Sequence, residues 1–165
     1  MDQRDAITLR PASWTGDRAA LEFVRRQVFV HEQGVPEQEE WDAADATCHH
    51  VLAHAGKRDA VGTGRLEPTG KIGRVAVLPP YRGTGVGTEI VSHLVNLATE
   101  LGLTQVYLHS QTTAVGFYER LGFRAEGPEF DEVGIPHRRM HLGIEQRNEH
   151  KVGRHGHPEH PVDAR

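Results

Sequence analysis

Short segments of alternating or continuous hydrophobic residues recur along this chain of 165 residues. Such segments are typical of strands with one or both faces buried. The pattern predicts strands at residues 6–10, 50–54, 60–66, 72–78, 105–109, 123–126 and 137–144. Hydrophobic residues spaced three and four apart instead predict helices beginning after Asp17, over 87–101 and over 113–121. The order of these segments places one helix between two parallel strands in the middle of the chain.

A glycine-rich run, Tyr81–Gly87, separates the strand predicted at 72–78 from the helix that follows. Glycine lets the backbone turn sharply and approach a ligand closely, and the start of a helix carries partial positive charge. The run therefore predicts a site for an anionic, diphosphate-bearing cofactor. It lacks the last glycine of the dinucleotide fingerprint and the lysine of the P-loop. Pro79 and Pro80 donate no ladder hydrogen bonds, so we expect the sheet to part beside the run and form a cleft.

The composition bounds the class of protein. The length and a hydrophobic content of 37% fit one domain, which we place at residues 1–145. A net charge of −4 with no basic block in the first 140 residues makes nucleic acid an unexpected partner. No segment has the length of a membrane span or the character of a signal peptide, so a cytoplasmic protein is expected. The oligomeric state is left open, with a homodimer as one option.

Cysteine and histidine usage gives little support for a metal centre. Cys48 is the single cysteine, which excludes an intrachain disulfide and a cysteine-only metal cluster. Residues 146–165 are rich in histidine and poor in large hydrophobic residues, so we expect a disordered tail. His155 and His157 could bind a metal weakly, but a solvated tail is the preferred interpretation. We therefore expect no metal in the functional site.

Two motifs resemble those of the GCN5-related N-acetyltransferase (GNAT) superfamily. The first is Arg82-x-x-Gly85-x-Gly87 between strand and helix, and the second is the segment Ala114–Phe123. The segments 25–34 and 132–137 are similar to the small bacterial ElaA-like branch. The resemblance implies an α/β fold of the GNAT type. Its mixed, mostly antiparallel sheet of about six to seven strands would be flanked by helices and splayed beside the cofactor.

The resemblance also implies how acetyl-CoA would be held. The backbone of Val75, Ala76 and Val77 would pair with the pantetheine arm as if with an added strand. N–H groups of the glycine-rich run, with Thr88 at the helix start and the Arg82 side chain, would bind the pyrophosphate. The residues of this implied phosphate site are Arg82, Gly83, Thr84, Gly85, Val86, Gly87 and Thr88. Gln111 stands where many members have an asparagine that bonds the cofactor.

Catalysis would require one proton donor and one proton acceptor. Tyr118 matches the family tyrosine that faces the cofactor sulfur, and its protonated phenol could donate to the departing thiolate. An amine is almost fully protonated at pH 7, so something must accept its proton. Glu32, Glu67 and His109 are the candidates, and a water chain leading to one of them would serve equally well. The six acids between residues 32 and 45 would attract a cationic amine.

The preferred interpretation is acetyl transfer from acetyl-CoA to a primary amine of a small molecule or peptide, directly within a ternary complex. Direct transfer fits a chain in which no convincing covalent nucleophile is found. A non-catalytic acyl-CoA sensor is one alternative, because the phosphate site could persist without turnover. A GNAT-fold enzyme with another acyl donor or acceptor, such as the acyl-homoserine-lactone synthases, is a second.

Overall fold

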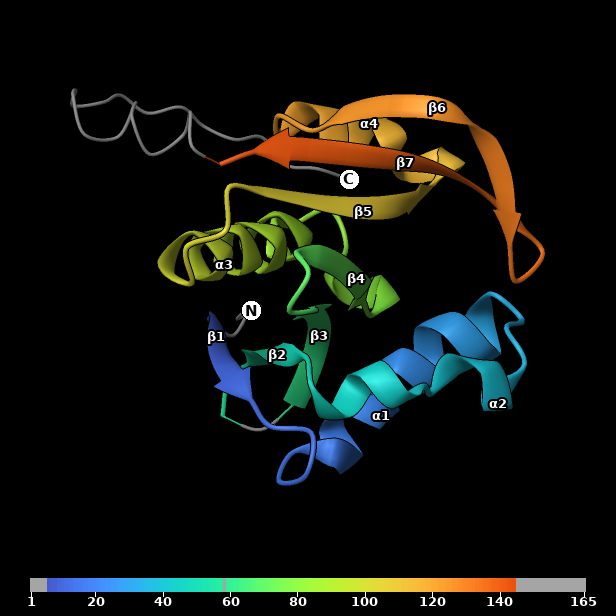
Figure 1. Cartoon of the computed structure of the whole chain (residues 1–165). Coiled ribbons are helices and arrows are strands. Elements are labelled where there is room, and N and C mark those ends of the chain that lie inside the picture. The colour runs from blue at the N-terminus through green and yellow to red at the C-terminus, as the bar shows by residue number, and fades with distance from the viewer. Residues whose placement is uncertain (1–5, 58, 145–165) are drawn as a thin grey trace.

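The computed structural model describes residues 6–57 and 59–144, and the predicted C-terminal tail lies outside these ranges. The strands form one seven-stranded sheet in the order β1-β2-β3-β4-β5-β7-β6 (Figure 1). Their bounds are β1 (Ile7–Ala12), β2 (His49–Ala55), β3 (Asp59–Leu66), β4 (Lys71–Val77), β5 (Gln105–Gln111), β6 (Arg124–Glu132) and β7 (Ile135–Gly143). The mixed α/β class and the strand number expected from the sequence are confirmed.

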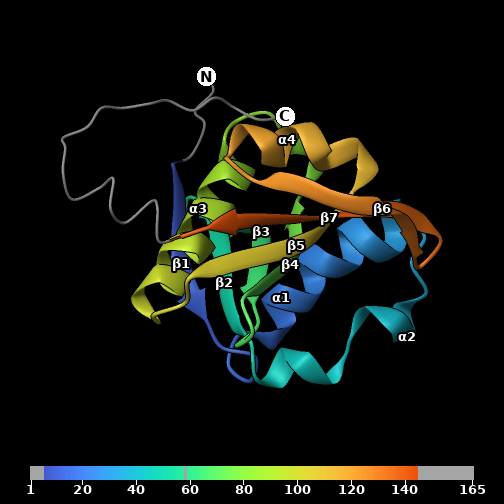
Figure 2. The ribbon, with the colours of Figure 1, turned by 45° about the horizontal axis from the view of Figure 1, so that its top comes forward.

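Helices cover both faces of the sheet (Figure 2). Those before β2 are α1 (Arg18–Arg25), the π-helix η1 (Arg26–Glu32), α2 (Glu37–Glu40) and the 3₁₀ turn η2 (Ala43–Ala46). Those after β4 are η3 (Pro79–Tyr81), α3 (Val86–Glu100), η4 (Thr112–Ala114) and α4 (Val115–Arg120). Side chains of α3 and α4 pack against one face, whereas those of α1 and η1 pack against Ala76 on the other.

The main core lies between α3 and the centre of the sheet. The hydrophobic positions of α3 are almost completely buried, at no more than 2% exposure: Val86, Ile90, Val91, Leu94, Val95 and Ala98. Gly62 and Gly64 on β3 leave room for this helix, because a Cβ at either position would lie within 3.0 Å of the Ile90 side chain. Complete burial of a leucine or isoleucine contributes about 1.5–3 kcal/mol. The helix that follows the glycine-rich run is therefore fixed firmly to the sheet.

The sheet parts in its middle. All strand pairs are antiparallel except β4 and β5, which are parallel and pair only through Lys71 with Tyr107 and Ile72 with Leu108. Arg74 adopts a left-handed backbone conformation, with φ of 51°, where the pairing of β3 with β4 is irregular. Beyond residue 72 the strands diverge, as the two prolines at the end of β4 led us to expect. This gap positions the functional site.

The N-terminal helical region differs from the sequence prediction. Asp17 does stand at the start of α1, but its carboxylate accepts hydrogen bonds from Ser13 N and Arg10 rather than from the helix. After α1 the chain widens into η1, in which Gln33 N donates to the carbonyl of Val28, five residues earlier. π-helical turns occur frequently at functional sites. None of the helices among residues 6–57 and 59–144 is long and apolar enough to cross a membrane.

Candidate functional site

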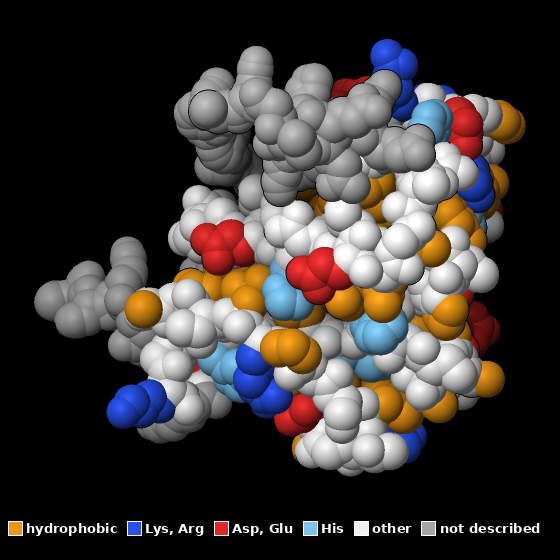
Figure 3. Space-filling model, turned by 60° about the vertical axis from the view of Figure 1, so that its left-hand side comes forward, with side chains coloured by type: hydrophobic (Ala, Val, Ile, Leu, Met, Phe, Trp, Pro, Cys, Tyr) orange, Lys and Arg blue, Asp and Glu red, His pale blue; other side chains and the backbone are white. Residues whose placement is uncertain are grey.

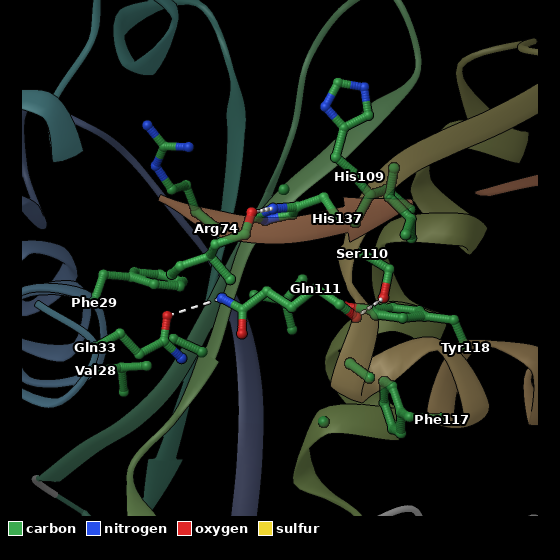
Figure 4. A pocket seen from close by; sticks show the side chains of 18 of the residues that line it. Val28, Phe29, Gln33, Arg74, His109, Ser110, Gln111, Phe117, Tyr118 and His137 are labelled. Carbon is green, nitrogen blue, oxygen red and sulfur yellow. Dashed lines mark hydrogen bonds between the residues drawn. The ribbon is translucent and has the colours of Figure 1, made fainter. Parts of the chain in front are cut away.

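A cavity of about 790 Å³ occupies the gap between β4 and β5. On the α3 side it is lined by Phe117, Tyr118 and the glycine-rich turn, and on the η1 side by His109, Gln111 and residues of α2 (Figure 4). Successive side chains of β5 point to opposite faces of the sheet, so its residues reach both sides of the cavity. The cavity thus connects the two faces of the sheet through the gap between the strands.

The glycine turn, defined here as residues 82–87, ends at the first residues of α3. Gly83 and Gly85 have φ of 77° and 93°, and a Cβ at either position would find no atom within 4 Å. Their backbone is therefore open to a ligand, and side chains there would fill the space such a ligand needs. Gly85 caps α3, whose fifteen residues direct their positive end at the turn. Thr88 Oγ1 is buried and has no hydrogen-bond partner among the described residues. These features fit a phosphate group.

Within the described part of the chain, the edge of β4 that faces β5 has no strand pairing beyond Ile72. On its other edge β4 pairs with β3 through Ala76 with Thr63 and Val77 with Gly62. The backbone of residues 75–77 lines the cavity. Amide groups of an extended ligand could add to this edge as a further strand would.

Arg82 and Glu32 form a two-point ion pair beside the glycine turn. The guanidinium Nη atoms lie 2.7 and 2.8 Å from the two carboxylate oxygens, and Nε donates to the Val77 carbonyl at 2.8 Å. Hydrogen bonding to Arg82 lowers the pKa of Glu32. A carboxylate with a lowered pKa is a weaker base, so this pair counts against Glu32 as the proton acceptor.

A second contact joins the end of η1 to β5. Gln111 donates from Nε2 to Oε1 of Gln33 at 2.8 Å, as the dashed line in Figure 4 shows. Glu32 and Gln33 are consecutive, so the end of η1 is tied both to the turn after β4 and to the end of β5. Sequence analysis missed Gln33, because nothing in a helical pattern indicates a π-helical turn that redirects two successive side chains.

Tyr118 lies on α4, where it is 9% exposed and lines the cavity. Its ring makes edge contacts with Phe117 and Phe123 at centroid distances of 4.8 and 5.7 Å. Burial raises the pKa of the Tyr118 hydroxyl. The phenol therefore keeps its proton throughout the physiological pH range and remains a hydrogen-bond donor.

A group of charged side chains, buried except for Arg74 and the exposed Asp42 at its edge, backs the η1 side of the cavity, and we call it the charge cluster. Each arginine in it contacts carboxylates: Asp45 lies 2.8 Å from Arg25 and 2.6 Å from Arg65. The cluster consists of Arg25, Glu40, Asp42, Asp45, Arg65 and Arg74. Three arginines thus face three carboxylates.

The acids between residues 32 and 45 were expected to attract a cationic amine, but most are already paired. Five of the six contact an arginine: Glu32, Glu37, Glu40, Asp42 and Asp45. The sixth, Glu39, lines the cavity. Glu67 also lines it and lies 3.7 Å from Arg65, beyond hydrogen-bond distance. The carboxylates available to an amine are therefore Glu39 and Glu67, rather than the whole acidic run.

His109 is held by a carboxylate. Its Nδ1 lies 3.0 Å from Oε1 of Glu132, and its ring meets Phe130 edge to face. Burial outweighs the effect of Glu132 and lowers the pKa of His109. A neutral imidazole is a competent base at neutral pH.

Most of the residues expected to form the site line this one cavity. They are Glu67, Val75, Ala76, Val77, Arg82, Gly83, Gly85, Gly87, His109, Gln111 and Tyr118. Glu32, Thr84, Val86 and Thr88 are not among the lining residues. Thr84 donates to the Tyr81 carbonyl within the turn, and Val86 belongs to the core. His137, the first residue of the strand predicted at 137–144, is buried on β7 and also lines the cavity.

Cys48 lies away from this cavity, in a smaller one of about 410 Å³ beside β1 and α3. Burial raises the pKa of its thiol to about 11, so little thiolate forms at neutral pH. Cys48 therefore lacks the setting of a covalent nucleophile. Figure 3 shows a face with part of α3, where acidic and basic side chains are scattered singly among apolar, histidine and uncharged groups.

Comparison with known proteins defines the class. A sequence model of the acetyltransferase (GNAT) domain matches residues 14–144. The Bacillus subtilis protein YyaT, which is uncharacterized, is 44% identical over 120 residues, covering 69% of this chain and 80% of YyaT. The uncharacterized N-acetyltransferase YjcF of the same organism is 38% identical over 122 residues, covering 72% and 86%.

A solved structure agrees with these relatives. The crystal structure of Escherichia coli ElaA superimposes with a TM-score of 0.74 at 28% identity, covering 83% of this chain and 99% of that one. The chain belongs to the GNAT acetyltransferase family, and the resemblance stated from its two motifs is confirmed.

Proposed function

We propose that this protein is an N-acetyltransferase that moves the acetyl group of acetyl-CoA directly to a primary amine of a small molecule or peptide. The observation that carries the proposal is the continuity of the cavity. It joins an unpaired strand edge and an open glycine turn on the α3 side to a polar chamber on the η1 side. A thioester entering from the first side could meet an amine entering from the second. Membership of the family supports acyl transfer, and the name of YjcF supports transfer to nitrogen.

The cofactor would lie along β4 and end at the glycine turn. The backbone of residues 75–77 would pair with the pantetheine amides, and N–H groups of the turn would bind the pyrophosphate. Thr88 Oγ1 is buried without a described partner and lies outside the cavity lining, so it would bind the anion only if the start of α3 shifted. Gln111 would reach the cofactor only by giving up or sharing its contact with Gln33.

Acetyl-CoA supplies an acyl group on a sulfur leaving group. The amine nitrogen bonds to the acetyl carbon, the carbon–sulfur bond breaks, and the amine loses one proton. Tyr118 lines the cavity and keeps its proton at neutral pH because burial raises its pKa, so it would donate a hydrogen bond to the departing thiolate and then a proton, although the raised pKa makes it a weak acid. Because a thiolate is already a tolerable leaving group, the hydroxyl would assist the reaction rather than make it possible.

The acceptor would be bound on the η1 side. The charge cluster is balanced within itself, so attraction of a cation would fall to Glu39 and Glu67, which line the cavity beside it. Both carboxylates would face a protonated amine or a second positive group of the acceptor. This supports an amine that carries a further positive charge.

The experiment measures release of the CoA thiol from acetyl-CoA across a panel of amines, with acetyl-CoA affinity measured by calorimetry. Gly85→Asp should weaken acetyl-CoA binding by at least 100-fold, because a carboxylate would occupy the open space at the turn. Gly127→Asp is the matched control, since Gly127 also has positive φ and open space but lies outside the cavity lining. Acceptor-dependent release would support the proposal. Tight binding without release for any amine would contradict it and favour a sensor of acyl-CoA.

A further inference from the structure

His137 lines the η1 side of the cavity. It stands directly opposite Gln111 of β5 and Phe130 of β6 in the sheet register, so three adjacent strands place these side chains in one row. His137 is 6% exposed and lines the cavity. Figure 4 shows it beside Gln111, between Arg74 and Ser110. A buried polar ring that lines a cavity can take part in chemistry as well as in packing.

The hydrogen bonding of His137 fixes its tautomer. Nδ1 lies 2.7 Å from the backbone carbonyl of Ile135. A carbonyl oxygen only accepts hydrogen bonds, so Nδ1 must carry the proton. In the neutral ring Nε2 therefore holds the lone pair. The ring is stacked on Phe130, with centroids 6.0 Å apart and planes inclined by 26°. His137 is thus an oriented base whose Nε2 has no hydrogen-bond partner among residues 6–57 and 59–144.

The other candidate bases are placed less favourably. Glu32 is engaged at both oxygens by Arg82. Glu67 follows β3 and has Arg65 as its nearest charged neighbour at 3.7 Å. His109 is a competent base, but Figure 4 shows its ring directed away from Gln111 and Tyr118. His137 instead lies opposite Gln111, at the end of β5 that borders the gap between the strands.

We propose that His137 is the general base that removes the proton from the acceptor amine, an assignment that rests on the proposed acetyltransferase function. As the bond from nitrogen to the acetyl carbon forms and the carbon–sulfur bond breaks, Nε2 takes the amine proton directly or through one water. The thiolate takes a proton from Tyr118, which regains one from water so that the phenol is restored. The imidazolium then returns its proton to water, and Nδ1 keeps its hydrogen bond to Ile135 throughout.

Charged and titratable groups from every surrounding element share the cavity with His137, and they bear on any measured pH dependence. Acids and bases both contribute, so the field at the ring is mixed. The groups are Glu39, Glu40 and Asp42 of the α2 region, Arg65 and Glu67 at the end of β3, Lys71 and Arg74 of β4, His109 of β5, and Glu132 of β6.

The decisive variant is His137→Asn, because the asparagine amide stands where Nδ1 stood and can still donate to the Ile135 carbonyl. It provides no basic lone pair. Loss of a general base costs about 10²–10⁴-fold in rate, so we expect turnover to fall at least 100-fold. Acetyl-CoA affinity should stay within a few-fold. The matched control is His141→Asn on the same strand, outside the cavity lining, which should leave turnover within about twofold.

The pH profile separates a base from a merely structural residue. Wild-type kcat/KM should fall at acidic pH with the pKa that NMR titration assigns to His137, and His137→Asn should lose this limb. If the variant does not fold, the wild-type protein still provides the test. The pKa of the acidic fall in its kcat/KM either agrees with the NMR pKa of His137, which supports the assignment, or differs from it, which contradicts the assignment. An active His137→Asn, or an acidic limb that follows His109 instead, overturns the assignment and leaves the acetyltransferase function standing. A wild-type protein that releases no CoA with any amine overturns both.

Discussion

Two groups of charged side chains adjoin the cavity, and they differ most in burial. In the charge cluster the side chains of Arg25, Glu40 and Asp45 are at most 4% exposed, whereas Arg82 and Glu32 at the glycine turn are each 40% exposed. Removing one partner of a buried pair leaves an uncompensated charge, while an exposed pair is solvated and contributes about 0–1 kcal/mol. The cluster can therefore fix the shape of the η1 side of the cavity, where we propose that the acceptor binds, and the exposed pair can exchange one partner for a ligand.

The largest expected effect is on stability. Asp45→Ala should lower the free energy of unfolding by about 3–5 kcal/mol, because Arg25 and Arg65 would lose a shared buried partner. Urea denaturation measures this loss. Glu37→Ala is the control, since Glu37 pairs with Arg26 at 2.8 Å but is 48% exposed, and about 0–1 kcal/mol is expected. Equal losses in the two variants would remove the distinction between the buried and the exposed pairs.

The buried cluster should also make stability depend on acid. Burial tends to raise the pKa of Asp45, but the hydrogen bonds and charges of Arg25 and Arg65 outweigh it and hold that pKa below its ordinary value of 3.8. The native state then binds fewer protons than the unfolded chain, so this stabilisation is complete above the ordinary pKa and lost as pH falls through the lower, folded-state value. The urea midpoint of the wild type should fall between pH 5 and 3. Asp45→Asn should show a shallower fall, and an unchanged slope would mean that other carboxylates dominate.

The backbone features of the α3 side of the cavity, where we propose that the cofactor binds, were predictable from the sequence because their signals are local. Strand, prolines, glycines and helix follow one another within about thirty residues, and each acts on its own backbone. The acceptor side depends on contacts between distant segments. In the sequence, Glu40 and Asp42 look like part of a solvated acidic run. Only the folded sheet shows that Arg65 of β3 and Arg74 of β4 pair with them. His137 follows a proline near a turn, and only the flanking strands bury it.

Tyr118→Phe should have an intermediate effect, on turnover rather than on stability. Removing the hydroxyl leaves the ring contacts with Phe117 and Phe123 in place. Turnover should fall roughly tenfold, which corresponds to about 1.4 kcal/mol in the barrier, and acetyl-CoA affinity should change by no more than a few-fold. Steady-state kinetics and calorimetry measure the two quantities. Tyr107→Phe on β5, outside the cavity lining, should be fully active. A fully active Tyr118→Phe would mean that Tyr118 contributes only through the packing of its ring.

The smallest effect on stability is expected at the exposed pair of Arg82 and Glu32. Substitutions there should instead change the affinity for acetyl-CoA. Glu32→Gln keeps the shape of the side chain and removes its charge, so the free energy of unfolding should change by less than about 1 kcal/mol. Acetyl-CoA affinity should rise a few-fold, because Arg82 would no longer be shared between the carboxylate and the phosphates. Arg82→Gln should lower that affinity and reduce its dependence on salt, since the charge that salt screens is gone. Calorimetry at two salt concentrations measures both variants. If neither affinity changes, Arg82 ties η1 to the glycine turn and takes no part in binding the cofactor.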